Sequence, residues 1–290
     1  MGAIKRFTFG KSAVDYNFDV TANWSGNGVT SAATFISFMN SRGMSSIVIT
    51  VFNLVGNRLQ MAYTASAATL DLRFLSVTDY QKGANALSGL QNLDLNFNEL
   101  TIFDPVEPCP INLFNLSVSF NPLSYINTNK INFIIYNISA GATNTLSSFV
   151  LNRSLPNLEL IILGGNRLST LGITAVQSNL TFLELANGNT FSTFEYGNLF
   201  PKLAYLAFSS QQFVRFNPTI PLSNTINTIQ FNGCKFTTQG YIDSEPWANS
   251  LTVRPGRGTI NFQDNPASAL GTNLKTILES KGFTVLSGAS

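Results

Sequence analysis

The chain has 290 residues, with 17 Lys and Arg against 15 Asp and Glu, which leaves a net charge of +2. Charged residues make up 11% of it, well below the roughly 25% usual for soluble domains, and nucleic-acid binding, which needs a clustered basic face, is not expected. The absence of histidine excludes His-based triads and His-ligated zinc, and Cys109 and Cys234 are too few for a four-Cys metal site, so no metal or cofactor is expected.

Residues 1–43 are predicted to form an N-terminal cap of strands plus a short helix. Apolar and polar residues alternate around Phe7, Phe9 and Phe18, which is typical of strands. Residues 31–39 then read as a short helix. We interpret the aromatic residues of this segment as the filling of its own core.

Neither an export signal nor a membrane span is expected. The basic pair Lys5 and Arg6 is not followed by the apolar stretch that a secretory signal needs. The longest uncharged stretch, between Lys130 and Arg153, is interrupted by asparagines and serines and cannot cross a bilayer. The chain is therefore expected to act where it is made or to leave the cell as part of a larger assembly.

A spaced apolar pattern recurs every 22 or 23 residues from residue 44 onward. Its clearest copy is Leu90, Leu93, Leu95, Asn98 and Leu100, which spells L-x-x-L-x-L-x-x-N-x-L. Around residues 131–136 the register stays open, and the last copy follows a longer insertion at about residues 237–258. The copies with a clear frame begin at Met44, Ala67, Leu90, Leu113, Leu158, Leu180, Leu203 and Ile226.

Each copy predicts one short strand with two apolar residues facing inward. A single copy cannot bury them, so neighbouring copies must stack into a parallel sheet. The Asn of each copy ends the strand, and its amide can bond backbone groups of adjacent turns. Asn98, Asn121, Asn166 and Asn265 are therefore interpreted as structural residues rather than ligands.

This pattern resembles the leucine-rich repeat family over residues 44–267. The resemblance implies an α/β leucine-rich repeat solenoid, with the parallel β-sheet on its concave face and a cap at both ends. Residues 268–290 are predicted to form the C-terminal cap, in which a helix from Asn273 stops at Gly282 and a strand follows. This closure resembles the endings of leucine-rich repeat proteins of Bacteroidetes and their phages.

The residues that flank the inward pair of each strand are expected on the exposed face, because side chains alternate along a strand. Exposed apolar patches usually mark interfaces, and amides beside aromatic rings are typical of sugar recognition. Alternatively, a solvated sheet simply carries polar side chains, and the apolar set packs against a neighbouring subunit or an inserted loop. The predicted partner-binding residues are Asp71, Arg73, Asp94, Leu160, Ile162, Phe182 and Tyr205.

One pair of carboxylates tests an enzymatic alternative. Asp71 and Asp94 occupy the same place on adjacent strands, about 4.8 Å apart, which approaches the carboxylate spacing of a retaining glycosidase. Arg73 on the same face is expected to hold both as ions and so to remove the acid with a raised pKa that this mechanism needs. Glu184 stands alone among apolar neighbours. We therefore expect no enzyme.

The resemblance implies a recognition scaffold, although a fold alone does not determine a function. The first hypothesis is a non-enzymatic structural or adhesion protein of a bacteriophage virion, in a tail, fibre or spike. Its partners would be other virion proteins, a host-surface protein or a surface glycan, with homo-oligomerisation open. The alternative is a bacterial leucine-rich repeat adhesin or effector, at the cell surface or outside the cell, that binds a protein through the concave face.

Overall fold

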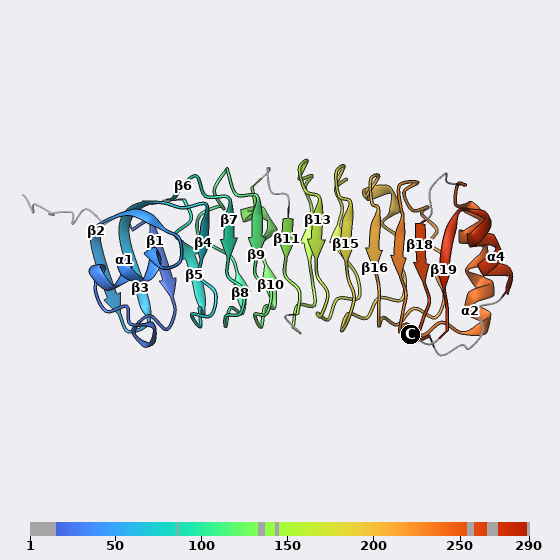
Figure 1. Cartoon of the computed structure of the whole chain (residues 1–290), viewed down its shortest axis with the longest axis horizontal. Helices are drawn as coiled ribbons and strands as arrows, with labels where there is room; N and C mark the ends of the chain where they lie inside the picture. The colour runs from blue at the N-terminus through green and yellow to red at the C-terminus, as the bar shows by residue number, and fades with distance from the viewer. Residues whose placement is uncertain are drawn as a thin grey trace, which may run out of the picture.

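The computed structural model describes residues 16–85, 87–132, 137–142, 145–253, 258–265 and 272–288. Phe7 and Phe9, predicted in the N-terminal strands, lie outside the described residues. The molecule is elongated, and the chain runs from one end to the other without doubling back (Figure 1). It is an α/β protein with few helices, built around one parallel sheet of ten strands.

The ten strands pair in chain order, so each strand lies between the one before it and the one after it (Figure 1). Equivalent residues lie side by side: Asn92 pairs with Thr69 on one side and with Asn115 on the other. The fourth strand settles the register that the sequence left open near residues 131–136. In chain order the strands are β4 (Thr69–Asp71), β7 (Asn92–Asp94), β9 (Asn115–Ser117), β11 (Asn137–Ser139), β13 (Leu160–Ile162), β15 (Phe182–Glu184), β16 (Tyr205–Ala207), β17 (Thr228–Gln230), β18 (Gly258–Asn261) and β19 (Phe283–Leu286).

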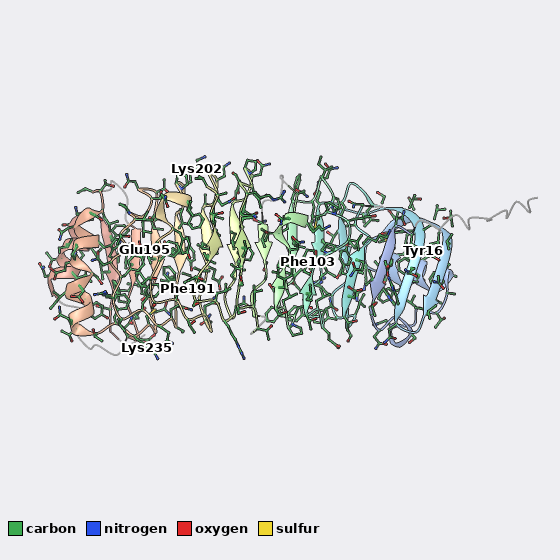
Figure 2. The ribbon with its side chains drawn as sticks, turned by 180° about the vertical axis from the view of Figure 1, so that it is seen from behind. Tyr16, Phe103, Phe191, Glu195, Lys202 and Lys235 are labelled. Atoms are coloured by element: carbon green, nitrogen blue, oxygen red, sulfur yellow. The ribbon has the colours of Figure 1, made fainter. Side chains whose placement is uncertain are left out.

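The middle residue of each short strand points into the core, as the repeat pattern predicts. Leu116, Leu183 and Leu206, for example, are fully buried. Burying such a side chain contributes roughly 2 kcal/mol, and each is covered only when the neighbouring turns are present. Seen from behind, Phe103 and Phe191 lie within the body of the ribbon (Figure 2). The core is thus one continuous stack along the long axis.

A ladder of side-chain amides joins successive turns. The Asn98 amide donates to the Leu72 carbonyl of the preceding turn at 2.8 Å, and its oxygen accepts from the backbone N–H of Leu75 at 3.0 Å. This confirms the structural role predicted for these asparagines. The matching bond to the preceding turn runs from Asn121 to Leu95, Asn166 to Ala140, Asn189 to Leu163, Gln211 to Leu185, Cys234 to Phe208 and Asn265 to Phe231.

The N-terminal end holds a separate five-stranded sheet and one helix. The predicted helix is present as α1 (Ala32–Asn40), which Ser31 caps by accepting a hydrogen bond from the backbone N–H of Thr34. Phe18, Trp24 and Phe35 pack ring against ring beneath it, with centroids 5.7–6.0 Å apart. The strands are β1 (Phe18–Thr21), β2 (Ser45–Val55), β3 (Arg58–Ser66), β5 (Asp79–Lys82) and β6 (Leu87–Ser88).

The copy predicted to begin at Met44 is not a turn of the ten-stranded sheet. Residues 45–66 form an antiparallel hairpin, β2–β3, closed at Gly56 with φ +58°. Ile47 and Ile49 fit both patterns, because the strand of a repeat also alternates, whereas the 11-residue length of β2 is that of a hairpin strand. The stacked sheet therefore begins at Thr69.

Two short parallel pairs lie apart from the ten-stranded sheet: β8 (Ile102–Phe103) with β10 (Tyr125–Ile126), and β12 (Val150–Leu151) with β14 (Gly172–Ile173). The predicted insertion contains two short helices, and the predicted helix, stop and strand close the chain at β19, where Gly282 has φ +92°. The remaining helices are the 3-10 turns Ser25–Asn27, Thr128–Lys130 and Gly197–Leu199, and α2 (Thr238–Asp243), α3 (Glu245–Ser250) and α4 (Thr272–Ser280).

Candidate functional site

The outer face of the ten-stranded sheet presents the first and third residue of each strand, and we call it the strand face. All seven residues predicted to bind a partner lie on this face or directly after it. The structure separates them into two clusters, because β9 and β11 lie between the strands of Asp94 and Leu160. The first cluster is charged and the second is apolar.

The charged cluster is an ion-pair network. Arg73 donates to both carboxylate oxygens of Asp71, at 2.9 and 3.0 Å, and its Nε lies 3.4 Å from Asp94 Oδ2. Arg42, which the sequence analysis did not assign to this face, donates to Asp71 Oδ1 at 3.1 Å. Two guanidinium groups therefore serve two carboxylates, and Asp71 holds most of the contacts.

The two carboxylates differ in pKa. Burial alone would raise the pKa of Asp71, but the hydrogen bonds from Arg73 and the charges of Arg42 and Arg73 lower it. For Asp94, burial raises the pKa, and the backbone N–H of Asn96 and the charge of Arg73 do not offset it. The prediction that Arg73 depresses both pKa values was therefore wrong for Asp94, which makes one weak contact with Arg73 instead of a bidentate pair.

Substitution of Asp71 by Asn is expected to lower the free energy of unfolding by about 1 kcal/mol near pH 7. The folded-state pKa of Asp71 lies below its unfolded value of about 3.9. Its stabilising contribution is thus complete above about pH 4 and is lost as pH falls through the folded-state pKa. Denaturant unfolding of both proteins across this range should show the difference shrinking on acidification. A difference independent of pH would refute the assignment.

A polar ladder crosses the first strands of this face. Asn92 donates to Thr69 Oγ1 at 3.1 Å, Asn115 donates to Asn92, and Asn137 donates to Asn115. Asn137 was missed because the register of its copy could not be read from the sequence. These amides hydrogen-bond one another across neighbouring strands, so they stabilise the sheet and have fewer groups left to bind a ligand.

The apolar cluster follows in the same row. Leu160 pairs with Phe182, and Phe182 with Tyr205, at the first position of three successive strands. The rings of Phe182 and Tyr205 stack in parallel, with centroids 4.3 Å apart and 1° between their planes. Ile162 and Glu184 form the third-position row beside them. All these side chains are half-buried, so the structure brings together four predicted residues on one continuous patch.

A column of three exposed phenylalanines was missed entirely. Phe74, Phe97 and Phe120 each stand just after a strand, with centroids 4.6 and 4.3 Å apart and 14° and 7° between their planes. Their exposed fractions are 63%, 42% and 50%, and φ is +59°, +58° and +56°. A phenylalanine just before the asparagine place of three successive copies was the available signal.

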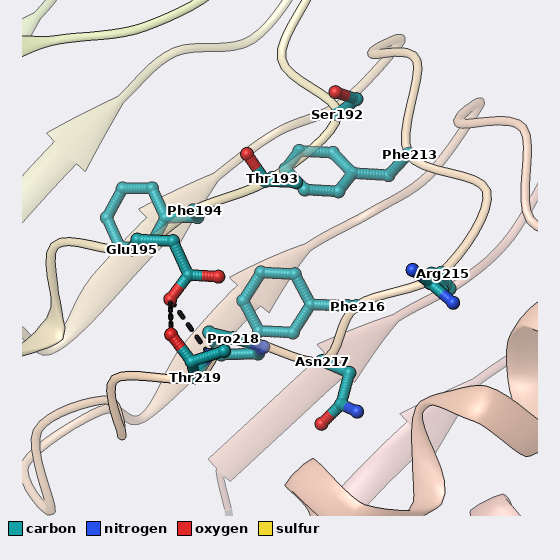
Figure 3. A pocket seen from close by; sticks show the side chains of 10 residues that line it. All are labelled: Ser192, Thr193, Phe194, Glu195, Phe213, Arg215, Phe216, Asn217, Pro218 and Thr219. Atoms are coloured by element: carbon teal, nitrogen blue, oxygen red, sulfur yellow. Dashed lines mark hydrogen bonds between the residues drawn. The ribbon is translucent and has the colours of Figure 1, made fainter.

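A recess outside the strand face is structural. Glu195 lies there with its Oε2 accepting hydrogen bonds from Thr219 Oγ1 at 2.7 Å and from the backbone N–H of Thr219 at 2.8 Å (Figure 3). The rings of Phe194, Phe213 and Phe216 that line it belong to the buried core. The Glu195 carboxylate that lines this 190 Å³ space is thus already hydrogen-bonded within the chain.

The remaining sequence expectations concern thiols, metals and membranes. Cys109 and Cys234 are both buried and unbonded to each other, and burial raises the pKa of both thiols to about 12. Among the residues that the structure describes, no cluster of acidic or cysteine side chains is placed to hold a metal ion. Within the same described ranges, no helix is long and apolar enough to cross a membrane.

The fold and the strand face define an α/β protein whose stacked parallel strands expose ladders of amides and rings. No protein-family model matches the chain, and no curated protein matches it either.

Proposed function

We propose that the chain is a leucine-rich repeat solenoid that acts as a non-enzymatic recognition protein, with the strand face as its concave binding surface. The observation that carries this proposal is the apolar cluster. Leu160, Ile162, Phe182 and Tyr205 form a half-buried patch on a sheet whose first strands carry polar residues. Exposed apolar patches of this kind usually mark a contact.

The recognition role is favoured over a hydrolase on two grounds. Asp71 is locked by two arginines, so it is a poor nucleophile, and its neighbour Asp94 faces an open sheet instead of an enclosed pocket. Asp94 and Asp71 also lie four and five strands from the ring of Phe182, where a substrate would find an aromatic surface.

We place the protein in a phage virion, in a tail, fibre or spike, where it would contact other virion proteins or a host surface. The low charge, the asparagine-rich surface and the resemblance of the C-terminal closure support this placement. The alternative is a bacterial adhesin or effector that uses the same face to bind a protein. In both hypotheses the apolar cluster is the surface that contacts the partner.

The double variant Phe182→Ala/Tyr205→Ala is expected to reduce binding to particles or cells of its source at least about tenfold, since interface aromatic residues dominate binding energy. A matched control is Ile102→Ala/Tyr125→Ala, which removes side chains that are 52% and 47% exposed in the separate β8–β10 pair. Thermal melts establish that both variants fold. Equal binding by the two variants would contradict the strand face as the contact surface.

A further inference from the structure

The column of exposed phenylalanines ends abruptly at Phe120. Phe97 covers one face of the Phe120 ring, and the column axis runs along the sheet, so the other face is turned toward the following turns. The residues in the same place on those turns are Ala142, Gly165 and Asn187, each with positive φ. The stack of rings therefore stops where the side chains become small.

An open trough of 330 Å³ begins at this point. Phe120 forms its end wall, and the glycines Gly141 and Gly164 form part of its floor. A side chain on Gly164 would come within 2.7 Å of Glu184 Oε1, so glycine keeps both the floor and the carboxylate in place. The trough continues the position of the ring column over the next turns.

The trough also carries free hydrogen-bonding groups. Ser119 and Ser139 bond each other at 2.8 Å, but the Glu184 carboxylate and the Asn187 amide have no hydrogen-bond partner among the described residues. Burial raises the pKa of Glu184. A half-buried carboxylate without a partner is costly, and a ligand that donates hydrogen bonds would offset that cost.

The backbone conformation of the three phenylalanines is unfavourable. A non-glycine residue in the left-handed region costs roughly 1–2 kcal/mol, and the three rings in that conformation stay 42–63% exposed. Asn or Gly, which occur here on later turns, would avoid most of this cost. Strain retained on an exposed aromatic surface points to a use for that surface.

We propose that the trough binds one ring of a neutral pyranose sugar, stacked on the free face of Phe120 and hydrogen-bonded to Glu184 and Asn187. A pyranose has an apolar C–H face that suits the electron-rich face of an aromatic ring. Its hydroxyl groups donate hydrogen bonds to the Glu184 carboxylate and to the Asn187 amide oxygen. A phenylalanine side chain of a protein partner has no donor and would leave both groups unpaired. None of the described lining residues is Lys or Arg, and this disfavours acidic sugars.

This inference rests on the proposed function, because it takes the strand face to be a recognition surface, and it names the ligand class and the subsite. The ligand would be part of a surface glycan whose further residues extend along the sheet toward the stacked rings of Phe182 and Tyr205. Both aromatic sites lie along the same face, and β11 and β13 separate the strand that precedes Phe120 from the strand of Phe182.

The test uses the full chain and the methyl glycosides of glucose, galactose, mannose, N-acetylglucosamine and N-acetylgalactosamine. Each is titrated to about 50 mM by saturation-transfer NMR, because a single ring binds in the millimolar range. At least one is expected to bind. Phe120→Ala should weaken that binding at least about tenfold, and Glu184→Gln about fivefold.

Two further variants sharpen the result. Ala142→Phe places a fourth ring at a position with φ +55°, where the preceding turns already carry phenylalanine, and it should fill the trough and abolish binding. Phe74→Ala removes an identical ring at the other end of the column and should leave binding within about twofold of wild type. If Ala142→Phe does not fold, Phe120→Ala, at an exposed position, still gives the answer.

Failure to bind any of the five glycosides would overturn the sugar proposal, and so would binding that survives both Phe120→Ala and Ala142→Phe. If the Phe182→Ala/Tyr205→Ala variant no longer binds particles or cells of the source, and the wild type binds none of the glycosides, the proposed function stands and the sugar subsite alone is wrong. Loss of glycoside binding on Phe120→Ala and Ala142→Phe, but not on Phe74→Ala, would support the proposal.

Discussion

Phe231→Ala is expected to lower the free energy of unfolding by about 4 kcal/mol, the largest effect of any single substitution considered. The Phe231 ring is fully buried. Its centroid lies 4.8 Å from that of Phe216 and 5.3 Å from that of Phe262. It also meets the Trp247 ring of the insertion edge to face. Truncation therefore leaves a cavity at the point where the stacked turns join the C-terminal helices.

Denaturant unfolding followed by circular dichroism measures this loss. Phe74→Ala is the matched control, because it removes the same ring at a position that is 63% exposed, and its effect should stay below about 1 kcal/mol. Equal losses of unfolding free energy in the two variants would show that the Phe231 ring does not join the stacked turns to the C-terminal helices.

Asn121→Ala is expected to cost about 3 kcal/mol, although it removes no apolar surface. Asn121 is 2% exposed. Its amide donates to the carbonyls of Leu95 at 2.8 Å and Val118 at 3.0 Å, and its oxygen accepts from the backbone N–H of Leu100 at 3.0 Å. Alanine removes the bonds to the Val118 carbonyl and the Leu100 N–H, whereas the Leu95 carbonyl still accepts from the Asn98 amide at 2.9 Å. Each buried group left unsatisfied carries a desolvation penalty.

The control for Asn121 is Asn152→Ala, at an exposed position where the side chain makes no hydrogen bond among the described residues. Its unfolding free energy should stay within about 0.5 kcal/mol of wild type. Hydrogen exchange of the Leu100 amide gives a second, local readout, and faster exchange is expected in Asn121→Ala alone. An unchanged free energy of unfolding in Asn121→Ala would show that the asparagine side chains do not join successive turns.

The parallel sheet and its asparagine ladder could be predicted from the sequence because both depend on spacing. A residue such as Leu93 must be buried by its neighbours on either side, and this requirement repeats every 22 or 23 residues. Copies without the asparagine keep its hydrogen bond as well, because Gln211 and Cys234 donate to the backbone of the preceding turn as asparagine does. The helix at α1 and the closure at Gly282 followed from local capping and turn chemistry.

Other features depend on contacts that spacing does not determine. The hairpin β2–β3 was missed because Ile47 and Ile49 satisfy both a repeat and a long strand. The raised pKa of Asp94 depends on how Arg73 divides its contacts between two carboxylates. The column at Phe74, Phe97 and Phe120 depends on a backbone with positive φ, which turns these rings onto one another instead of into the core.

The proposed role as a virion component is tested most directly by fractionating the native source on a density gradient and identifying this chain by mass spectrometry. We expect the chain to band with assembled particles at a fixed stoichiometry to the other particle proteins. Recovery of the chain only among free soluble proteins, with none in the particle band, would contradict it.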